Sequence, residues 1–176
     1  AMPVREKVDS RDIVLNKADQ TVSFNKPLSL DLGGIAKGYI ADELAETLEG
    51  AGFADFAVSV GGEMVCAGSP LSRKGWSIDL EGPGQKVVAS MELSRTALSS
   101  SGDSYQFAEI EGKRSAHVLD PDTGKGKQDQ LNITVIAPTA MQADAWATAL
   151  RGLGVEKGYT LAAKTGLIEA FFAPAA

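Results

Sequence analysis

The spacing of apolar residues changes repeatedly along this chain, and this change constrains the fold more than any other feature. Residues 56–60 alternate between apolar and small or polar side chains, a period of two that is typical of a half-buried strand. Residues 139–153 have the spacing of a helix instead, and Thr139 and Gln142 form a capping box at its start. Such alternation predicts an α/β (mixed α+β) fold, with one domain of mixed sheet and packed helices over residues 1–176.

The same criteria predict the other elements. Extended segments are expected at 22–24, 30–32, 76–80, 91–93, 133–136 and 167–172, and a hairpin joins 105–110 to 115–119 around the turn E-G-K-R. Helices are expected between Gly34 and Gly50 and over 155–164. The apolar side of the first helix is predicted to be formed by Ile40, Leu44 and Leu48, flanked by Ala41 and Ala45. That of the second is predicted to be formed by Met141, Ala145, Trp146, Ala149, Leu150 and Leu153.

Composition excludes several classes of protein. The chain has 176 residues, of which 44% are hydrophobic, enough for one domain with a sizeable core. The formal net charge is −6 and the basic residues are scattered, which argues against a general nucleic-acid binder. No stretch approaches the roughly 18 apolar residues that a transmembrane segment needs. The lone cysteine, Cys66, excludes an internal disulfide and is expected to pack as a small buried residue.

A glycine pair stands in the stretch D-L-G-G-I-A-K-G-Y-I-A-D, residues 31–42. It has the spacing of neither a Walker loop nor a dinucleotide fingerprint. A tight turn at Gly33 and Gly34 followed by a helix start would still present backbone N–H groups to an anion, with Lys37 beside it. The alternative is an ordinary strand-to-helix turn with a surface lysine.

A second glycine pair, Gly61 and Gly62, follows the strand pattern in S-V-G-G-E-M. Two glycine pairs at strand ends are compatible with the floor of one cleft. They are equally compatible with two ordinary turns.

The stretch H-V-L-D-P-D-T-G contains His117, the only histidine of the chain. Its unperturbed pKa of about 6.5 suits a group that accepts a proton near neutral pH. A single histidine on a strand can also be a packed or surface residue, and Asp120 reads as part of a turn.

The predicted helix 139–153 contains Asp144 and Thr148, which are four residues apart and therefore point to the same side. A carboxylate and a hydroxyl in this arrangement suit a hard cation such as Mg²⁺, whose coordination is often completed by substrate phosphates. The alternative is that Asp144, Thr148 and Arg151 form the solvent-exposed side of the helix.

Taken together and in this order, the motifs resemble the ApbE family of FAD:protein FMN transferases. The resemblance rests on D-L-G-G-I-A-K-G-Y, V-G-G-E, S-G-D, H-V-L-D-P-D-T-G and I-A-P-T-A-M-Q-A-D-A-W-A-T-A-L, which together span about residues 31–153. It implies an unusually short form that lacks the usual N-terminal part of the family.

The resemblance also implies a reaction. Family members split FAD at its pyrophosphate with the help of Mg²⁺ and attach FMN through a phosphoester to a threonine of a client protein, and AMP leaves. The clients carry a threonine motif of the type D-x-x-[ST]-G-A-T. Two alternatives remain: a module that binds FAD without transfer, and an FAD pyrophosphatase that releases FMN and AMP. The family is typically exported and lipid-anchored in bacteria, which implies a periplasmic or membrane-associated location; the chain itself shows no signal, so a cytoplasmic one stays open.

Carried over residue by residue, the resemblance gives His117 the role of proton acceptor. Asp144 and Thr148, with the carbonyl of Ala36, correspond to the Mg²⁺ ligands, and Lys37 lies near the phosphates. The residues implied to contact FAD are Gly33, Gly34, Ile35, Lys37, Gly61, Gly62, Glu63, Ser101 and Gly102.

Overall fold

The chain divides into two compact units, Ala1–Leu32 and Gly33–Ala176. The computed structural model describes residues 9–71, 73–102, 107–110, 113–116, 118 and 131–174. In the first unit a short 3₁₀ turn, η1 (Ser10–Asp12), precedes a hairpin of β1 (Ile13–Asn16) and β2 (Thr21–Phe24). The hairpin contains the predicted strand 22–24. The single-domain organisation stays a prediction.

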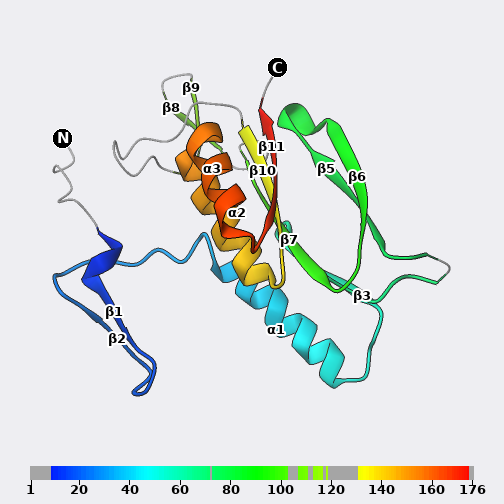
Figure 1. The fold of residues 1–176 in the computed structure, drawn as a ribbon, viewed down its shortest axis with the longest axis horizontal. Helices are drawn as coiled ribbons and strands as arrows, with labels where there is room; N and C mark the ends of the chain where they lie inside the picture. Colours follow the sequence, from blue (N-terminus) through cyan, green and yellow to red (C-terminus); the bar gives the residue numbers. More distant parts are fainter. Residues whose placement is uncertain are drawn as a thin grey trace. The chain divides into compact units, whose positions relative to one another are not determined.

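A five-stranded sheet forms the centre of the second unit (Figure 1). Its order is β11-β10-β7-β4-β3, and each neighbouring pair is antiparallel. The strands are β3 (Phe56–Val60), β4 (Glu63–Ala67), β7 (Thr96–Ser101), β10 (Leu131–Ala137) and β11 (Glu169–Pro174). The predictions at 56–60, 133–136 and 167–172 are confirmed, whereas β4 and β7 were not predicted as strands.

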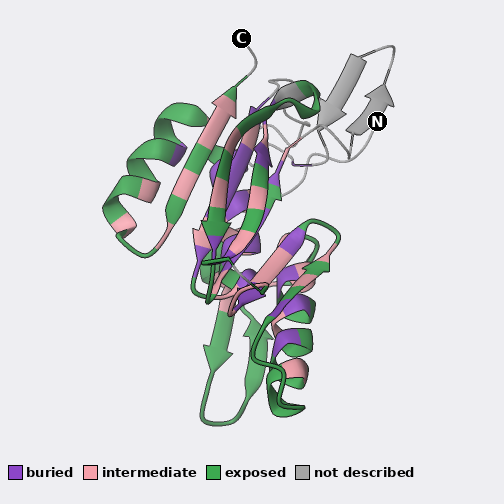
Figure 2. Ribbon diagram, turned by 90° about the vertical axis from the view of Figure 1, so that its right-hand side faces the viewer, coloured by how far each residue is buried: buried purple, intermediate pink, exposed green. Residues whose placement is uncertain are grey.

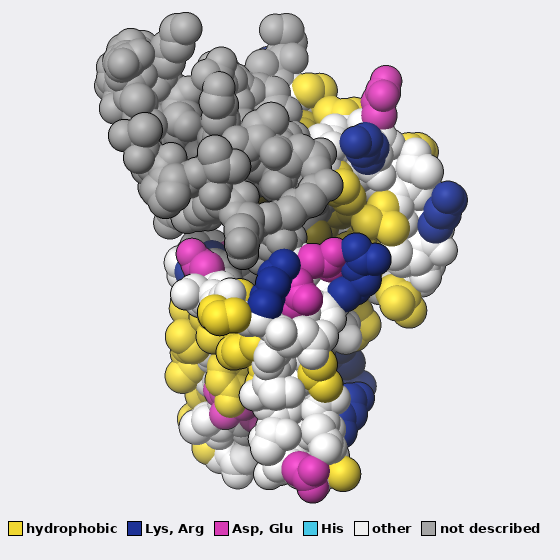
Figure 3. All heavy atoms as spheres, turned by 90° about the vertical axis from the view of Figure 1, so that its left-hand side faces the viewer, with side chains coloured by type: hydrophobic (Ala, Val, Ile, Leu, Met, Phe, Trp, Pro, Cys, Tyr) yellow, Lys and Arg dark blue, Asp and Glu magenta, His cyan; other side chains and the backbone are white. Residues whose placement is uncertain are grey.

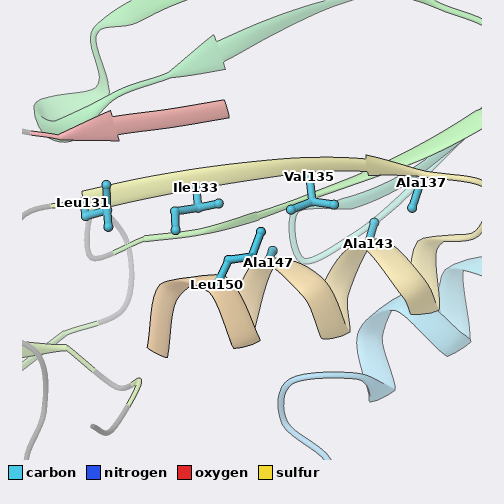
Figure 4. Packing of buried hydrophobic residues seen from close by; sticks show 7 residues of the cluster. All are labelled: Leu131, Ile133, Val135, Ala137, Ala143, Ala147 and Leu150. Carbon is cyan, nitrogen blue, oxygen red and sulfur yellow. The ribbon is translucent and has the colours of Figure 1, made fainter. Parts of the chain in front are cut away.

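Helices cover one face of this sheet. The helices are α1 (Ala36–Gly50), α2 (Ala140–Leu153) and α3 (Val155–Thr165). Small and branched side chains of α2 pack against β10, and Figure 4 shows Ala143, Ala147 and Leu150 directed at the strand. Each Å² of apolar surface that is buried stabilises the fold by about 25 cal/mol. This contact therefore holds α2 against the sheet.

A second hairpin packs against the opposite face of the sheet. β5 (Trp76–Glu81) and β6 (Val87–Leu93) are joined through the turn η2 (Pro83–Gln85). Leu80 and Leu93 pack there with Cys66, which is buried as predicted. A further pair, β8 (Phe107–Ile110) and β9 (Lys113–Ala116), confirms that a hairpin forms here, although β9 begins at Lys113, two residues before the predicted second strand. The strands and helices together confirm the α+β class. Figure 2 shows the buried residues concentrated on the central strands and on the helix sides turned toward them.

The predicted apolar sides of α1 and α2 were wrong in part: Ala41, Ala45 and Leu150 are buried as predicted, but several of the larger residues are exposed. Ile40 and Leu44 are exposed, and the buried residues of α1 are Gly38, Ala41 and Ala45. In α2, Met141, Ala149 and Leu153 are exposed, and the buried residues are Ala140, Ala143, Asp144, Ala147, Leu150 and Arg151. The physical reason is that α1 and α2 lie against each other and against the sheet, so their contact surfaces need small side chains.

The segment before the first glycine pair also differs from the prediction. Residues 30–32 have no strand partner and form no regular element, although a strand was expected to lead into Gly33. The turn itself is present at 33–35, and Ile35 is the N-cap of α1.

The capping of α2 involves α1. Thr139 accepts a hydrogen bond from the Gln142 N–H at 3.2 Å, as the capping box predicted. In addition, the Asp42 carboxylate of α1 accepts from the N–H groups of Ala140 at 2.7 Å and Met141 at 2.9 Å. One carboxylate thus satisfies two N–H groups that would otherwise lack intrahelical partners.

We expect Asp42→Ala to lower the free energy of unfolding by about 1–2 kcal/mol, because it removes a charged cap from the start of α2. Chemical denaturation measures the change. Glu46→Ala, on the exposed side of α1, is the control for loss of one acidic group and should stay within about 0.5 kcal/mol of the unmutated chain. Equal loss in both variants would contradict the role of Asp42 as a cap.

Candidate active site

The site is built where the start of α1 meets α2. The N-cap residue of α1, Ile35, makes no side-chain capping bond. Asp144 of α2 supplies one instead, because its Oδ2 accepts from the Gly38 N–H at 3.0 Å. Asp144 is 2% exposed. Each helix therefore provides an aspartate that caps the other, and this exchange fixes the position of Asp144 at the positive end of α1.

Lys37 lies between two carboxylates. Its Nζ is 2.6 Å from Oε1 of Glu63 and 3.9 Å from Oδ1 of Asp144. The first distance is that of a charge-assisted hydrogen bond, whereas the second is too long for one. Lys37 was expected near the phosphates of a ligand; its direct partner in the structure is Glu63.

Glu63 is the first residue of β4 and is 2% exposed. Burial raises the pKa of its carboxyl group, the hydrogen bond and charge of Lys37 act in the opposite direction, and the Asp144 charge raises it further. Oε1 also accepts from the Ser99 hydroxyl at 3.3 Å, and Oε2 is buried with no hydrogen-bond partner among the described residues. A buried carboxylate with one unsatisfied oxygen is costly, and such groups are found at functional sites as well as in structural ion pairs.

Gly34 brings the first turn of the site against Thr148. A Cβ built at Gly34 would lie 2.8 Å from Cγ2 and 3.1 Å from Oγ1 of Thr148. The absence of a side chain at this position is therefore required by the approach of α2. The hydroxyl of Thr148 and the carboxylate of Asp144 lie on the same side of α2, as predicted.

The second glycine pair forms the two-residue turn between β3 and β4. Gly61 and Gly62 have φ values of 62° and 107°, which favour glycine, and Val60 pairs with Glu63 across the turn. A Cβ at Gly61 would lie 3.2 Å from Cδ of Lys37. The pair is thus an ordinary hairpin turn that also borders the site.

For the remaining predicted site residues, the structure gives less detail. Ala36 is the first residue of α1. Ser101 ends β7, where it is buried, and Gly102 packs against Asn132. His117 follows β9 directly and lies outside the described residues, so its role stays a prediction.

The alternative that Asp144 and Arg151 belong to a solvent-exposed side of α2 is wrong, because both side chains are buried. Sequence analysis missed Asp42 and Ser99. For Ser99 the run Ser99–Ser101 offered a signal, because alternate serines on a strand share one face. For Asp42 there was none, since an aspartate inside a helix pattern ordinarily reads as solvent-exposed.

The site residues can supply oxygen ligands for a cation without forming a complete cage. Among the described residues, no three or more His, Cys, Asp or Glu side chains are grouped so as to hold a metal. Asp144 and Thr148 offer one carboxylate and one hydroxyl, a set that suits Mg²⁺ when phosphates complete the coordination. On the face shown in Figure 3, basic and acidic side chains lie interspersed. In the parts of the chain that are described, no helix has the length and apolarity needed to span a membrane.

The fold is that of known flavin transferases. The chain superposes on the apo form of the flavinyl transferase ApbE of Pseudomonas stutzeri with a TM-score of 0.81 at 31% identity, covering 97% of this chain and 53% of that one. For the ApbE protein of Thermotoga maritima the TM-score is 0.83 at 26% identity, covering 96% and 56%.

A model of the ApbE family matches residues 2–172, and the chain belongs to this family. The match extends on both sides of the 31–153 stretch on which the resemblance was based. The chain is 38% identical over 172 residues to the FAD:protein FMN transferase of Escherichia coli K12, covering 95% of this chain and 49% of that protein. It is 39% identical over 166 residues to that of Haemophilus influenzae, covering 91% and 48%. The chain thus spans about half the length of these curated relatives.

Proposed function

We propose that this chain carries the catalytic residues of an FAD:protein FMN transferase. The observation that supports this most is the convergence of Gly34, Lys37, Asp144 and Thr148 at one site. These residues come from two sequence motifs about a hundred residues apart. The relatives named FAD:protein FMN transferase at 38% and 39% identity support the same reaction.

The proposed step is a phosphoryl-type transfer. The hydroxyl oxygen of a client threonine attacks the phosphorus of the FMN half of FAD, and its proton passes to His117. The bond from that phosphorus to the bridging oxygen breaks, and AMP leaves with this oxygen. Mg²⁺, held by Asp144, Thr148 and the carbonyl of Ala36, would neutralise charge on the phosphate oxygens.

The chain's own residues position the reacting groups. The start of α1 directs N–H groups and its positive dipole end toward the place where the diphosphate is proposed to lie, beside Gly33 and Gly34. The turn Gly61–Gly62 and the segment Ser101–Gly102 are proposed to border the flavin nucleotide. The client is proposed to carry a D-x-x-[ST]-G-A-T type motif, and a periplasmic location rests on the family resemblance.

The test incubates the chain with FAD, Mg²⁺ and a client domain bearing that motif, followed by mass spectrometry of all products. We expect the client to gain one FMN unit and AMP to appear in equal amount. Free FMN with AMP would indicate a pyrophosphatase instead, and unchanged FAD that is nevertheless bound would indicate a binding module. His117→Ala should lose transfer and keep nucleotide binding within a few-fold; equal loss of both would mean that the histidine is structural.

A further inference from the structure

The ammonium group of Lys37 lies much closer to one of its two neighbouring carboxylates than to the other, and this difference requires an explanation. Its ammonium is 2.6 Å from Oε1 of Glu63 but 3.9 Å from Oδ1 of Asp144. Both carboxylates are buried, and the two distances place a single positive charge between two negative ones. Lys37 therefore forms its short contact with Glu63 and only a long ion pair with Oδ1 of Asp144, beyond hydrogen-bond distance.

Two features hold Glu63 in this arrangement. Its backbone is fixed by pairing with Val60 across the glycine turn, and its Oε1 receives a hydrogen bond from the Ser99 hydroxyl at 3.3 Å. The stem of Lys37 lies over Gly61, where a Cβ would be 3.2 Å from Cδ. The turn without side chains thus gives Lys37 the space it needs to reach Glu63.

Asp144 has one oxygen already in use. Oδ2 accepts from the Gly38 N–H at 3.0 Å, so we expect Oδ1, which lies 3.9 Å from the Lys37 ammonium, to be the oxygen that binds the cation. An ammonium that moved about an ångström closer would form its own hydrogen bond with Oδ1 and compete with that cation. We propose that Glu63 is a positioning residue that keeps the Lys37 ammonium off Asp144 and so leaves Oδ1 open to a divalent cation.

This inference rests on the Mg²⁺ site of the proposed function and predicts opposite effects for the two members of the ion pair. Glu63→Gln removes one negative charge and releases Lys37 toward Asp144, and both changes weaken cation binding. Lys37→Met removes the competing charge and keeps the length of the side chain, so it strengthens binding. Because Glu63 acts through Lys37, the effect of Glu63→Gln should largely disappear when Lys37 is already methionine.

The experiment is a calorimetric titration of the 176-residue chain with Mg²⁺, once with Mg²⁺ alone and once with FAD present so that its phosphates can complete the coordination, for the unmutated chain, both single variants and the double variant. We expect Glu63→Gln to weaken binding at least about tenfold and Lys37→Met to tighten it, as expected for a full charge about 4 Å away. The double variant should bind Mg²⁺ within a few-fold of Lys37→Met, because the effect of Glu63→Gln depends on the lysine. Glu49→Gln, in the exposed last turn of α1, is the control for loss of one negative charge and should leave binding unchanged.

Each other outcome contradicts a defined part of the proposal. If the unmutated chain binds Mg²⁺ and Glu63→Gln binds it equally well, the inference fails and the proposed function stands. If Glu63→Gln weakens binding as much in the Lys37→Met background as in the unmutated chain, Glu63 acts on the metal directly and not through Lys37. If the unmutated chain binds Mg²⁺ neither alone nor with FAD present, the metal site of the proposed function fails, and this inference with it.

Discussion

Replacing Gly38 by alanine is expected to lower the free energy of unfolding by about 2–4 kcal/mol, even though alanine is intrinsically the better helix former by about 1 kcal/mol. A Cβ at this position would lie 2.3 Å from the carbonyl oxygen of Ala140 and 2.7 Å from Cα of Met141. These are backbone atoms at the start of α2, so no side chain can rotate away. Relief requires α1 and α2 to separate.

Gly50→Ala is the matched control. Gly50 is the last residue of α1, and nothing lies within 4 Å of a Cβ built there. The same substitution should therefore be neutral or stabilise the protein by up to about 1 kcal/mol. Denaturant unfolding of both variants gives the comparison. A Gly38→Ala protein as stable as Gly50→Ala would show that the two helices do not approach each other as closely as described.

The same substitution also bears on the site. Gly38 donates its N–H to Asp144, and Asp42, on the next turn of α1, caps α2. Separation of the helices would lengthen both contacts together. The close approach at Gly38 therefore couples the stability of the helix pair to the geometry of the candidate cation site.

The helix positions could be predicted from the sequence because they depend on local signals. The capping residue Thr139 and the terminating glycines act within one or two turns, and both helices are found where those signals place them. The buried sides could not be predicted in the same way. Large apolar residues normally mark the core, but here the close helix contact selects glycine and alanine, so Ile40 and Leu44 remain exposed.

In the candidate site, too, the features set by local spacing could be predicted and those set by tertiary contacts could not. Asp144 and Thr148 are adjacent on α2 because of helical periodicity, so their shared side followed from spacing alone. The ion pair between Lys37 and Glu63 joins positions 26 residues apart, and the capping bond between Gly38 and Asp144 joins positions 106 apart. Such contacts depend on how α1, α2 and the β3–β4 turn pack together. The spacing of residues within each segment does not reveal this packing.

Asp144→Asn is expected to abolish the proposed Mg²⁺-dependent FMN transfer and the proposed binding of Mg²⁺, while stability stays within about 1 kcal/mol of the unmutated chain. The reason is that the cap that Asp144 provides and the metal-binding role proposed for it depend on different properties of the side chain. Its Oδ2 caps α1 through the Gly38 N–H, and an asparagine oxygen can accept that bond equally well. The negative charge at Oδ1, which the proposed cation needs, is lost.

Asp144→Ala separates the two functions further, because it removes the cap together with the charge. It should lose Mg²⁺ binding to the same extent and, in addition, about 1–2 kcal/mol of unfolding free energy. Calorimetry with Mg²⁺ and denaturant unfolding, applied to both variants, distinguish a ligand from a cap. If the asparagine variant still binds Mg²⁺ and only the alanine variant loses stability, Asp144 is a helix cap and the cation is held elsewhere. Loss of binding in both, with stability lost only in the alanine variant, would show that one carboxylate caps α1 and binds the metal at the same time.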